Sequence, residues 1–117
     1  MSKRVVSLRL PAALVEDLAQ SAADAQLSVA AALEWLLRNS FGNPDLLRAL
    51  EDCQERPNAK LDARITGATL DSLRVATVEL RTSNSVYIRK LLYHFFVTKR
   101  LKYVRSDGHY TLAGRHD

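Results

Sequence analysis

The sequence predicts a single compact domain that is mainly α-helical and contains a two-stranded antiparallel β-ribbon. A chain of 117 residues is long enough for one domain with a modest core. Its 47% hydrophobic and 26% charged residues are typical of a globular protein and not of a disordered one. The third observation is internal. A strand followed by two helices is predicted twice, and two short strands that are unstable alone are expected to pair.

Two pairs of segments carry this repeat. The segment LRLPAALVEDL (8–18) matches ARITGATLDSL (63–73) in the order of residue types, although few residues are identical. The same offset, without a gap, sets LSVAAALEWLL (27–37) over TSNSVYIRKLL (82–92). Both copies read as an alternating strand, a helix opener, an apolar helix, a Ser-led turn and a second helix. Each copy therefore predicts one β-α-α unit.

The first unit starts with a strand that has one apolar side, because Val6, Leu8 and Leu10 recur at every second position. Pro11 stops this strand and suits the first turn of a helix. Ser28 can cap the second helix through its hydroxyl. The helical stripes of this unit are Leu14, Leu18 and Ala22, then Leu33, Leu36, Leu37 and Ser40.

The second unit repeats these features. Leu61, Ala63 and Ile65 form the inward side of its strand, and Thr66 and Ser83 are predicted helix caps. The helical stripes are Leu70, Leu73, Thr77 and Leu80, then Ile88, Leu91, Leu92, Phe95 and Phe96.

The repeat sets the expected boundaries. They are 1–42 for the first unit, 43–57 for a linker with a short helix, 58–104 for the second unit and 105–117 for a flexible tail. The linker helix would begin at Asn43-Pro44 and end before Pro57. The last helix of the second unit would run to about Tyr103. The Asp107-Gly108 turn allows a small hairpin, but a flexible tail is the expectation.

Charge and composition limit the function classes. The net charge is +4, and the basic residues concentrate after the linker, which indicates a polyanionic partner. The N-terminus lacks a signal-peptide pattern and no apolar run could span a bilayer, so a cytoplasmic protein is the expectation. Cys53 is the only cysteine. It shows no metal-ligand spacing with His94, His109 or His116, and no glycine-rich phosphate loop is present, so we expect neither cofactor nor catalysis.

The order of strand, Pro, helix, Ser-led turn and helix resembles the ribbon-helix-helix family, which includes the Arc and methionine repressors. The resemblance covers roughly residues 3–41 and 58–100. In that family two copies pair their strands into an antiparallel ribbon whose polar side chains enter the major groove of DNA. Usually two chains supply the copies, whereas tandem versions occur among accessory proteins of plasmid conjugation. The resemblance implies a tandem pseudo-dimer that binds double-stranded DNA as a monomer. Its use would be transcription regulation, for example as a repressor, or plasmid DNA processing.

Antiparallel pairing of the two strands then defines an outward face. If Ser7 lies opposite Asp62, Arg9 faces Lys60 and Val5 faces Arg64. The Arg9–Lys60 pair has like charges, which costs sheet stability but suits a face that binds DNA. Arginine can donate two hydrogen bonds to guanine, serine can form hydrogen bonds with several bases, and aspartate can accept a hydrogen bond from cytosine. The candidate base-reading residues are Val5, Ser7, Arg9, Lys60, Asp62 and Arg64.

The starts of the second helices are candidate phosphate sites, because their backbone N–H groups lack partners within the helix. The candidates are Ser28, Val29, Ser83, Asn84, Arg89 and Lys90. Basic residues stand near the second start in the sequence and not near the first. We therefore expect the two halves to bind DNA unequally and to prefer an asymmetric site.

Other interpretations stay open. The outward strand residues could form a solvated face, and Ser28 and Ser83 could be helix caps and nothing more. Trp35 is expected to pack under the linker helix. The chain could be a protein–protein adaptor or an antitoxin-like module, or two chains could pair their ribbons.

Overall fold

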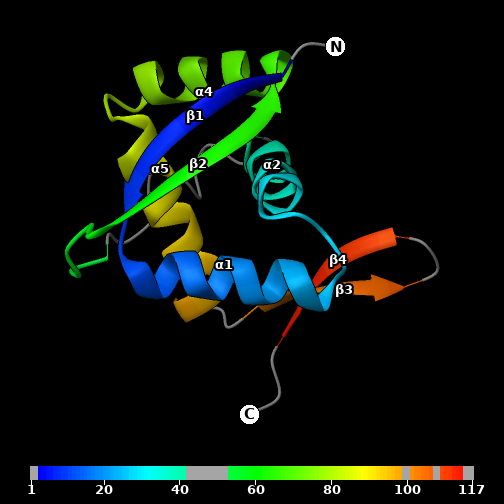
Figure 1. Cartoon of the computed structure of the whole chain (residues 1–117). Coiled ribbons are helices and arrows are strands. Elements are labelled where there is room, and N and C mark those ends of the chain that lie inside the picture. The colour runs from blue at the N-terminus through cyan, green and yellow to red at the C-terminus, as the bar shows by residue number, and fades with distance from the viewer. Residues whose placement is uncertain (1–2, 42–52, 99–100, 107–108, 115–117) are drawn as a thin grey trace.

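The protein is mainly helical with a two-stranded antiparallel β-ribbon laid across its helices (Figure 1). The structure is a computed structural model that describes residues 3–41, 53–98, 101–106 and 109–114. The ribbon consists of β1 and β2, and the element order strand, helix, helix occurs twice. The elements of the two units are β1 (Lys3–Leu10), α1 (Ala12–Asp24) and α2 (Val29–Ser40), then β2 (Ala59–Thr66), α4 (Gly67–Glu79) and α5 (Asn84–Leu92).

The register of the ribbon is the one that the sequence predicts. Ser7 pairs with Asp62, and the neighbouring outward pairs join Arg9 to Lys60 and Val5 to Arg64. On the inner face of β1 the alternate side chains from Val6 onward are buried, whereas Arg4 is exposed, and on β2 the facing Ala59 and Leu61 are half-buried. The buried side chains of the ribbon are Val6, Leu8, Leu10, Ala63 and Ile65. Burying one apolar row fixes the register, because a slip by one residue would turn that row to solvent.

Three predicted helix caps are confirmed. Ser28 Oγ accepts a hydrogen bond from the Ala31 N–H at 3.1 Å, which caps α2. Thr66 Oγ1 caps α4 and Ser83 Oγ caps α5 in the same way. Each cap satisfies one of the N–H groups that a helix start leaves without a partner.

The turn between the two helices has the same backbone form in both units. Gln26 and Arg81 hold positive φ angles of 59° and 54° at equivalent positions of the repeat. In each case the next N–H reaches back to the preceding helix, over 2.8 Å from Leu27 to Ala22 O and over 2.9 Å from Thr82 to Thr77 O. This left-handed helix end usually carries glycine. Neither position is glycine, so the sequence gives no sign of it.

The second helix of each unit packs on the strand of the other unit, so the two units share one hydrophobic core. Helix α2 packs on β2 and helix α5 packs on β1, while α1 and α4 flank the ribbon (Figure 1). The largest fully buried side chains come from both strands and all four of these helices. They are Leu8, Leu10, Leu14, Leu18, Leu33, Leu36, Leu37, Ile65, Leu73, Ile88 and Leu91.

The chain after α5 differs from the prediction of one long helix. Helix α5 ends at Leu92, a π-helical segment follows over Tyr93–Thr98, and β3 (Leu101–Ser106) pairs with β4 (His109–Gly114). The predicted helix to Tyr103 is therefore wrong, and the hairpin is formed where a flexible tail was expected. Aromatic and β-branched residues on both sides of an Asp-Gly pair favour a hairpin over continued helix.

Some expectations fall outside the described residues. The linker helix is one of them, because residues 42–52 are not described, and its packing over the half-buried Trp35 is another. In the part of the chain that the structure describes, no helix is both long and apolar enough to cross a bilayer.

The two faces of β1 predict opposite responses to truncation. Leu8→Ala should lower the free energy of unfolding by about 2–5 kcal/mol, because it removes a fully buried side chain from the shared core. Val5→Ala, on the outward face of the same strand, should change it by less than about 0.5 kcal/mol. Urea denaturation followed by circular dichroism measures both. Equal losses in the two variants would contradict the assigned register.

A buried hydrogen bond between side chains joins the last residue of α2 to the first turn of α5. The Tyr87 hydroxyl lies 2.9 Å from Ser40 Oγ, and both side chains are buried. Burial raises the pKa of Tyr87 above its ordinary value of 10.0, because the phenolate loses hydration, and the Ser40 hydrogen bond offsets part of this shift.

This raised pKa predicts a loss of stability in alkali. The unfolded chain loses the Tyr87 proton near pH 10, and the folded chain loses it only at higher pH. The contribution of Tyr87 to the free energy of unfolding is therefore complete below about pH 10 and is lost as the pH rises through the pKa of the folded state. Tyr87→Phe should cost about 1 kcal/mol at neutral pH and weaken the decline above pH 10. Denaturation midpoints between about pH 8 and pH 11 measure this. An unchanged decline in the variant would contradict the assignment.

Candidate nucleic-acid interface

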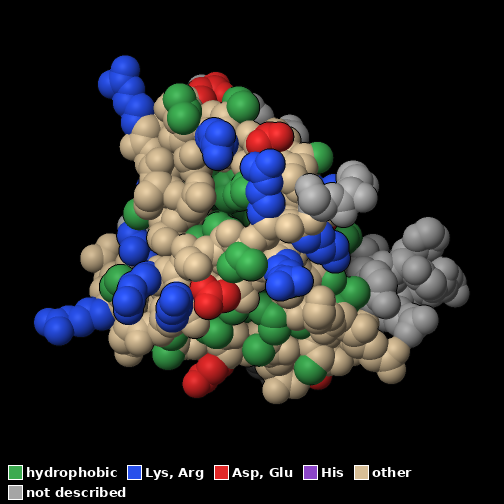
Figure 2. All heavy atoms as spheres, turned by 45° about the horizontal axis from the view of Figure 1, so that its top comes forward, with side chains coloured by type: hydrophobic (Ala, Val, Ile, Leu, Met, Phe, Trp, Pro, Cys, Tyr) green, Lys and Arg blue, Asp and Glu red, His purple; other side chains and the backbone are tan. Residues whose placement is uncertain are grey.

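The outward face of the ribbon carries the six residues that the sequence predicts as base readers. Val5, Ser7 and Arg9 of β1 are exposed, as are Lys60, Asp62 and Arg64 of β2. Val5 is 54% exposed, although an apolar side chain on a strand normally faces the core. Figure 2, which brings the top of Figure 1 forward, shows Lys and Arg side chains spread across this side of the molecule, with a few Asp and Glu side chains between them.

At the centre of this face the two strands are joined by side chains. Ser7 Oγ donates a hydrogen bond to Asp62 Oδ1 at 2.7 Å. Lys60 Nζ lies 3.9 Å from Asp62 Oδ2, and both side chains are more than half exposed. Asp62 therefore contacts the neighbouring Lys60, whereas no ion pair among the described residues joins it to Arg9. Such an exposed pair stabilises the fold by less than about 1 kcal/mol.

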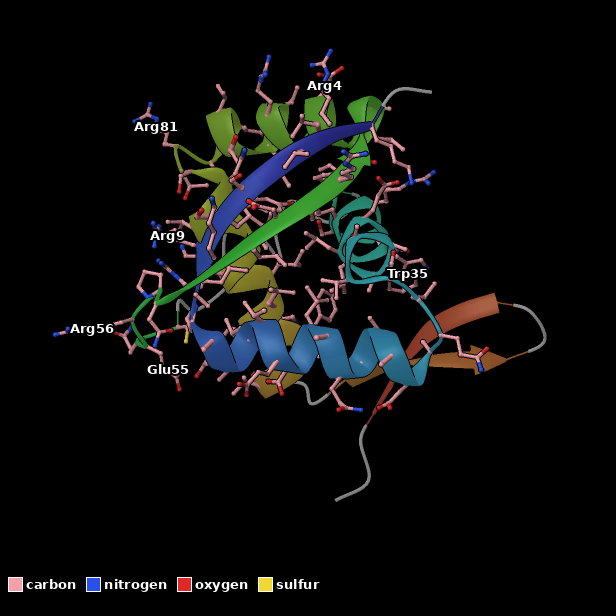
Figure 3. The ribbon with its side chains drawn as sticks, viewed as in Figure 1. Arg4, Arg9, Trp35, Glu55, Arg56 and Arg81 are labelled. Carbon is pink, nitrogen blue, oxygen red and sulfur yellow. The ribbon has the colours of Figure 1, made fainter. Side chains whose placement is uncertain are left out.

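The two arginines of the outward face stand at its two ends. Within the described residues, no carboxylate pairs with the guanidinium group of Arg9 or of Arg64. Figure 3 marks the two ends of β1 by Arg9 and by Arg4. Arg4 is next to Val5, the residue that pairs with Arg64. Each guanidinium has five N–H donors in a planar fork, which can grip an acceptor pair such as guanine N7 and O6. Both arginines are therefore available to a ligand.

The start of α5 lies against the end of the ribbon that carries Arg9. The Arg9 backbone N–H points away from β2 and donates to Ser85 Oγ in the first turn of α5 at 3.3 Å. This hydrogen bond gives the Arg9 N–H, which lies on the open edge of β1, an acceptor. It also brings Ser83 and Asn84 next to the outward face. Arg89 and Lys90 follow one turn later on α5 and are partly buried.

The start of α2 lies against the other end of the ribbon, across a hollow of about 550 Å³. Ser28 of the helix start and Arg64 of β2 both line it, together with Lys3 and Arg38. The other lining residues are Ala30, Ala31, Glu34, Trp35 and Asn39. Val29 is the first residue of α2 and is partly buried, so its backbone N–H is what it can offer a phosphate.

Lys3 and Arg38 were missed by reasoning from the sequence, which found no basic residue near this helix start. Lys3 could have been found, because the antiparallel register places it just beyond the Val5–Arg64 pair. Arg38 reaches the hollow from the far end of α2, and no spacing rule signals that. Both helix starts therefore have basic side chains close by.

An acidic residue distinguishes the two ends. Glu34 Oε1 accepts a hydrogen bond from the Thr66 N–H at 2.6 Å, where β2 passes into α4. Pro11 holds the equivalent position after β1, and proline has no N–H to satisfy. The repeat accordingly sets Arg89 where the first unit has Glu34. Glu34 places a negative charge beside the α2 start, whereas the equivalent residue of the second unit, Arg89, is basic.

Comparison of the chain with models of known protein families, with curated proteins and with solved structures finds no match in any of the three. In the part of the chain with described placement, no group of three or more His, Cys, Asp or Glu side chains could hold a metal ion.

The Glu34 contact predicts a graded loss of stability. Glu34→Ala leaves the partly buried Thr66 N–H without its acceptor and should cost about 1–3 kcal/mol. Glu34→Gln keeps a carbonyl oxygen at this position and should cost less, since only the charge is lost. Thermal unfolding of the three proteins measures this order. A glutamine variant as unstable as the alanine variant would show that the hydrogen bond is not the source of the effect.

Proposed function

We propose that this protein binds double-stranded DNA sequence-specifically, with the β1–β2 ribbon in the major groove. It would act as a transcriptional regulator or as an accessory factor in DNA processing on a plasmid or other mobile element. The observation that carries the proposal is the outward face of the ribbon, where exposed Arg9 and Arg64 stand at opposite ends without an ion pair in the described residues. A two-stranded ribbon fits the width of the major groove.

The proposal includes a tandem ribbon-helix-helix architecture in which one chain supplies both halves of a pseudo-dimer. It is supported by the repeated order of elements and by the shared positive-φ turn at Gln26 and Arg81. It is also supported by the pairing of the two strands within one chain. Arg9 and Arg64 then hold equivalent positions in the two units.

The helix starts would supply the backbone contacts. Ser28-Val29 and Ser83-Asn84 present N–H groups at the positive ends of α2 and α5, and such ends favour phosphate. Each start lies at one end of the ribbon, so both could reach DNA strands that border the same groove. Glu34 beside the first start would weaken its contact, and we infer unequal halves and an asymmetric site.

A protein-binding role has one observation in its favour. Val75 and Val78 on α4 are 67% and 72% exposed and lie one helical turn apart. Two valines make a small patch, and scattered exposed apolar residues are normal. Salt separates the two functions, because DNA affinity carried by several phosphate contacts falls steeply as ionic strength rises, whereas docking on apolar residues does not.

Loss of either outward arginine should weaken binding to the selected DNA. Arg9→Ala or Arg64→Ala should cost about 1–3 kcal/mol on the preferred site and relax the sequence requirement at one position. The preferred site comes from selection in a random duplex library, and fluorescence anisotropy then gives the affinities. Lys90→Ala should weaken all duplexes more evenly, since a phosphate contact carries no sequence information.

Arg4→Ala is the matched control for these variants. It removes the same charge from the same strand, but the alternation of β1 places its side chain on the face opposite to that of Arg9. Its ratio of affinities for selected and random duplexes should match that of the wild-type protein. Arg9→Ala and Arg64→Ala variants that also keep this ratio would contradict groove reading by the ribbon.

A further inference from the structure

The hydrogen-bonding character of the outward face is fixed at its centre. A serine hydroxyl has one proton, and Ser7 gives it to Asp62 Oδ1 over 2.7 Å. Ser7 therefore turns only lone pairs towards a ligand. A carboxylate accepts hydrogen bonds and does not donate them, and the Asp62 side chain is 51% exposed. The centre of the face thus consists of acceptors.

The neighbouring lysine leaves this character intact. The 3.9 Å between Lys60 Nζ and Asp62 Oδ2 is longer than the 2.7–2.9 Å of a charge-assisted hydrogen bond. Each carboxylate oxygen has two lone pairs, so Asp62 Oδ2 keeps accepting capacity for a donor on a ligand.

The two ends of the face have the opposite character. Arginine has donors and no acceptor, and Arg9 and Arg64 stand on either side of the central pair. Along the ribbon the face therefore alternates donor, acceptor, donor. Between the two units the arginines are alike, while the central residues, Ser7 and Asp62, are unlike although the repeat makes them equivalent.

We propose that the Ser7–Asp62 pair determines specificity at the middle of the DNA site, where it selects cytosine or adenine beneath Asp62 and rejects guanine. This inference rests on the proposed DNA binding. Cytosine N4 and adenine N6 are the amino donors of the major groove, and they match a surface made of acceptors. Guanine presents N7 and O6 there, which would face the Asp62 oxygens without a proton between them.

The same face sets the spacing of the site. Successive outward pairs are two residues apart, about 6.8 Å along an antiparallel strand. Base pairs are stacked about 3.4 Å apart, so guanines that meet Arg9 and Arg64 lie at most about two base pairs from the centre. The expected target has guanines on both sides of a middle that is not symmetric.

The test starts from the site that the wild-type protein selects in a random duplex library. Arg9→Ala and Arg64→Ala should each relax the requirement for guanine at one position of this site. The midpoint between these two positions is the centre of the site. Affinities are then measured for duplexes with cytosine, adenine or guanine at the centre on the strand beneath Asp62. The wild-type protein should bind the guanine duplex about tenfold more weakly than the other two.

Two variants at position 62 and one control carry the comparison. Asparagine can still accept the Ser7 hydrogen bond and can also donate to guanine, so Asp62→Asn should reduce the discrimination to less than about threefold. Asp62→Ser, which also adds a donor, should do the same. Asp71→Asn on α4 removes the same charge from an exposed position and should keep the wild-type ratio.

The outcomes separate this inference from the function on which it rests. A wild-type protein that selects no sequence and binds duplex DNA without salt dependence overturns the proposed function. If the arginines read flanking guanines but the centre prefers guanine beneath Asp62, or both variants at position 62 keep the wild-type discrimination, the inference is overturned and DNA binding stands. Loss of discrimination in the two variants, with the Asp71→Asn ratio unchanged, supports the inference.

Discussion

The pairing of β1 with β2 within one chain is the interaction on which the rest of the structure depends. Burial of Leu8 and Leu10 on one strand and Ile65 on the other holds the inner row in the core. The outer row follows without further choice, because alternate side chains of a strand point to opposite faces. The composition of the outward face is a consequence of that register, from the Ser7–Asp62 hydrogen bond to the Arg9–Lys60 pair.

The second helices of the two units provide hydrogen-bond acceptors for the edges of the ribbon. A two-stranded ribbon has two open edges, and each receives a side chain from the second helix of the other unit. Ser85 satisfies the edge of β1 at Arg9, and Glu34 satisfies the end of β2 at Thr66. The bonds that stabilise the ribbon therefore also place the helix starts beside its outward face. The helix starts can therefore be displaced only by weakening the fold, and the proposed phosphate contacts would depend on the same bonds.

Much of this arrangement could be predicted from the sequence because it depends on local chemistry or on simple periodicity. The caps at Ser28, Thr66 and Ser83 need only a hydroxyl before a helix. The ribbon register follows from alternation together with the repeat offset. The position of Arg38 in the hollow at the α2 start could not be predicted in the same way, since no spacing rule places it near Arg64 and only the packing of the whole domain brings the two together.

The errors at the end of the chain have a different cause. After α5 the apolar spacing continues, and periodicity alone extends the helix to Tyr103, whereas the structure changes to a π-helical segment and then to a hairpin. Strand-forming residues and the Asp-Gly turn determine the structure of this segment. A search for helical periodicity takes neither into account. The positive-φ turns at Gln26 and Arg81 were missed for a related reason, because a bond back to the preceding helix fixes them and no glycine marks them.

The most direct test of the intrachain ribbon is an isotope-filtered NOE measurement on a mixture of labelled and unlabelled chains. In uniformly labelled protein, backbone protons of Ser7 and Asp62 should show cross-strand NOEs, as should those of Val5 and Arg64. In the mixed sample, filtered to show contacts between labelled and unlabelled chains, these NOEs should vanish. Their persistence in the filtered spectrum would show that two molecules share each ribbon and would contradict the single-chain pairing from which the interface is built.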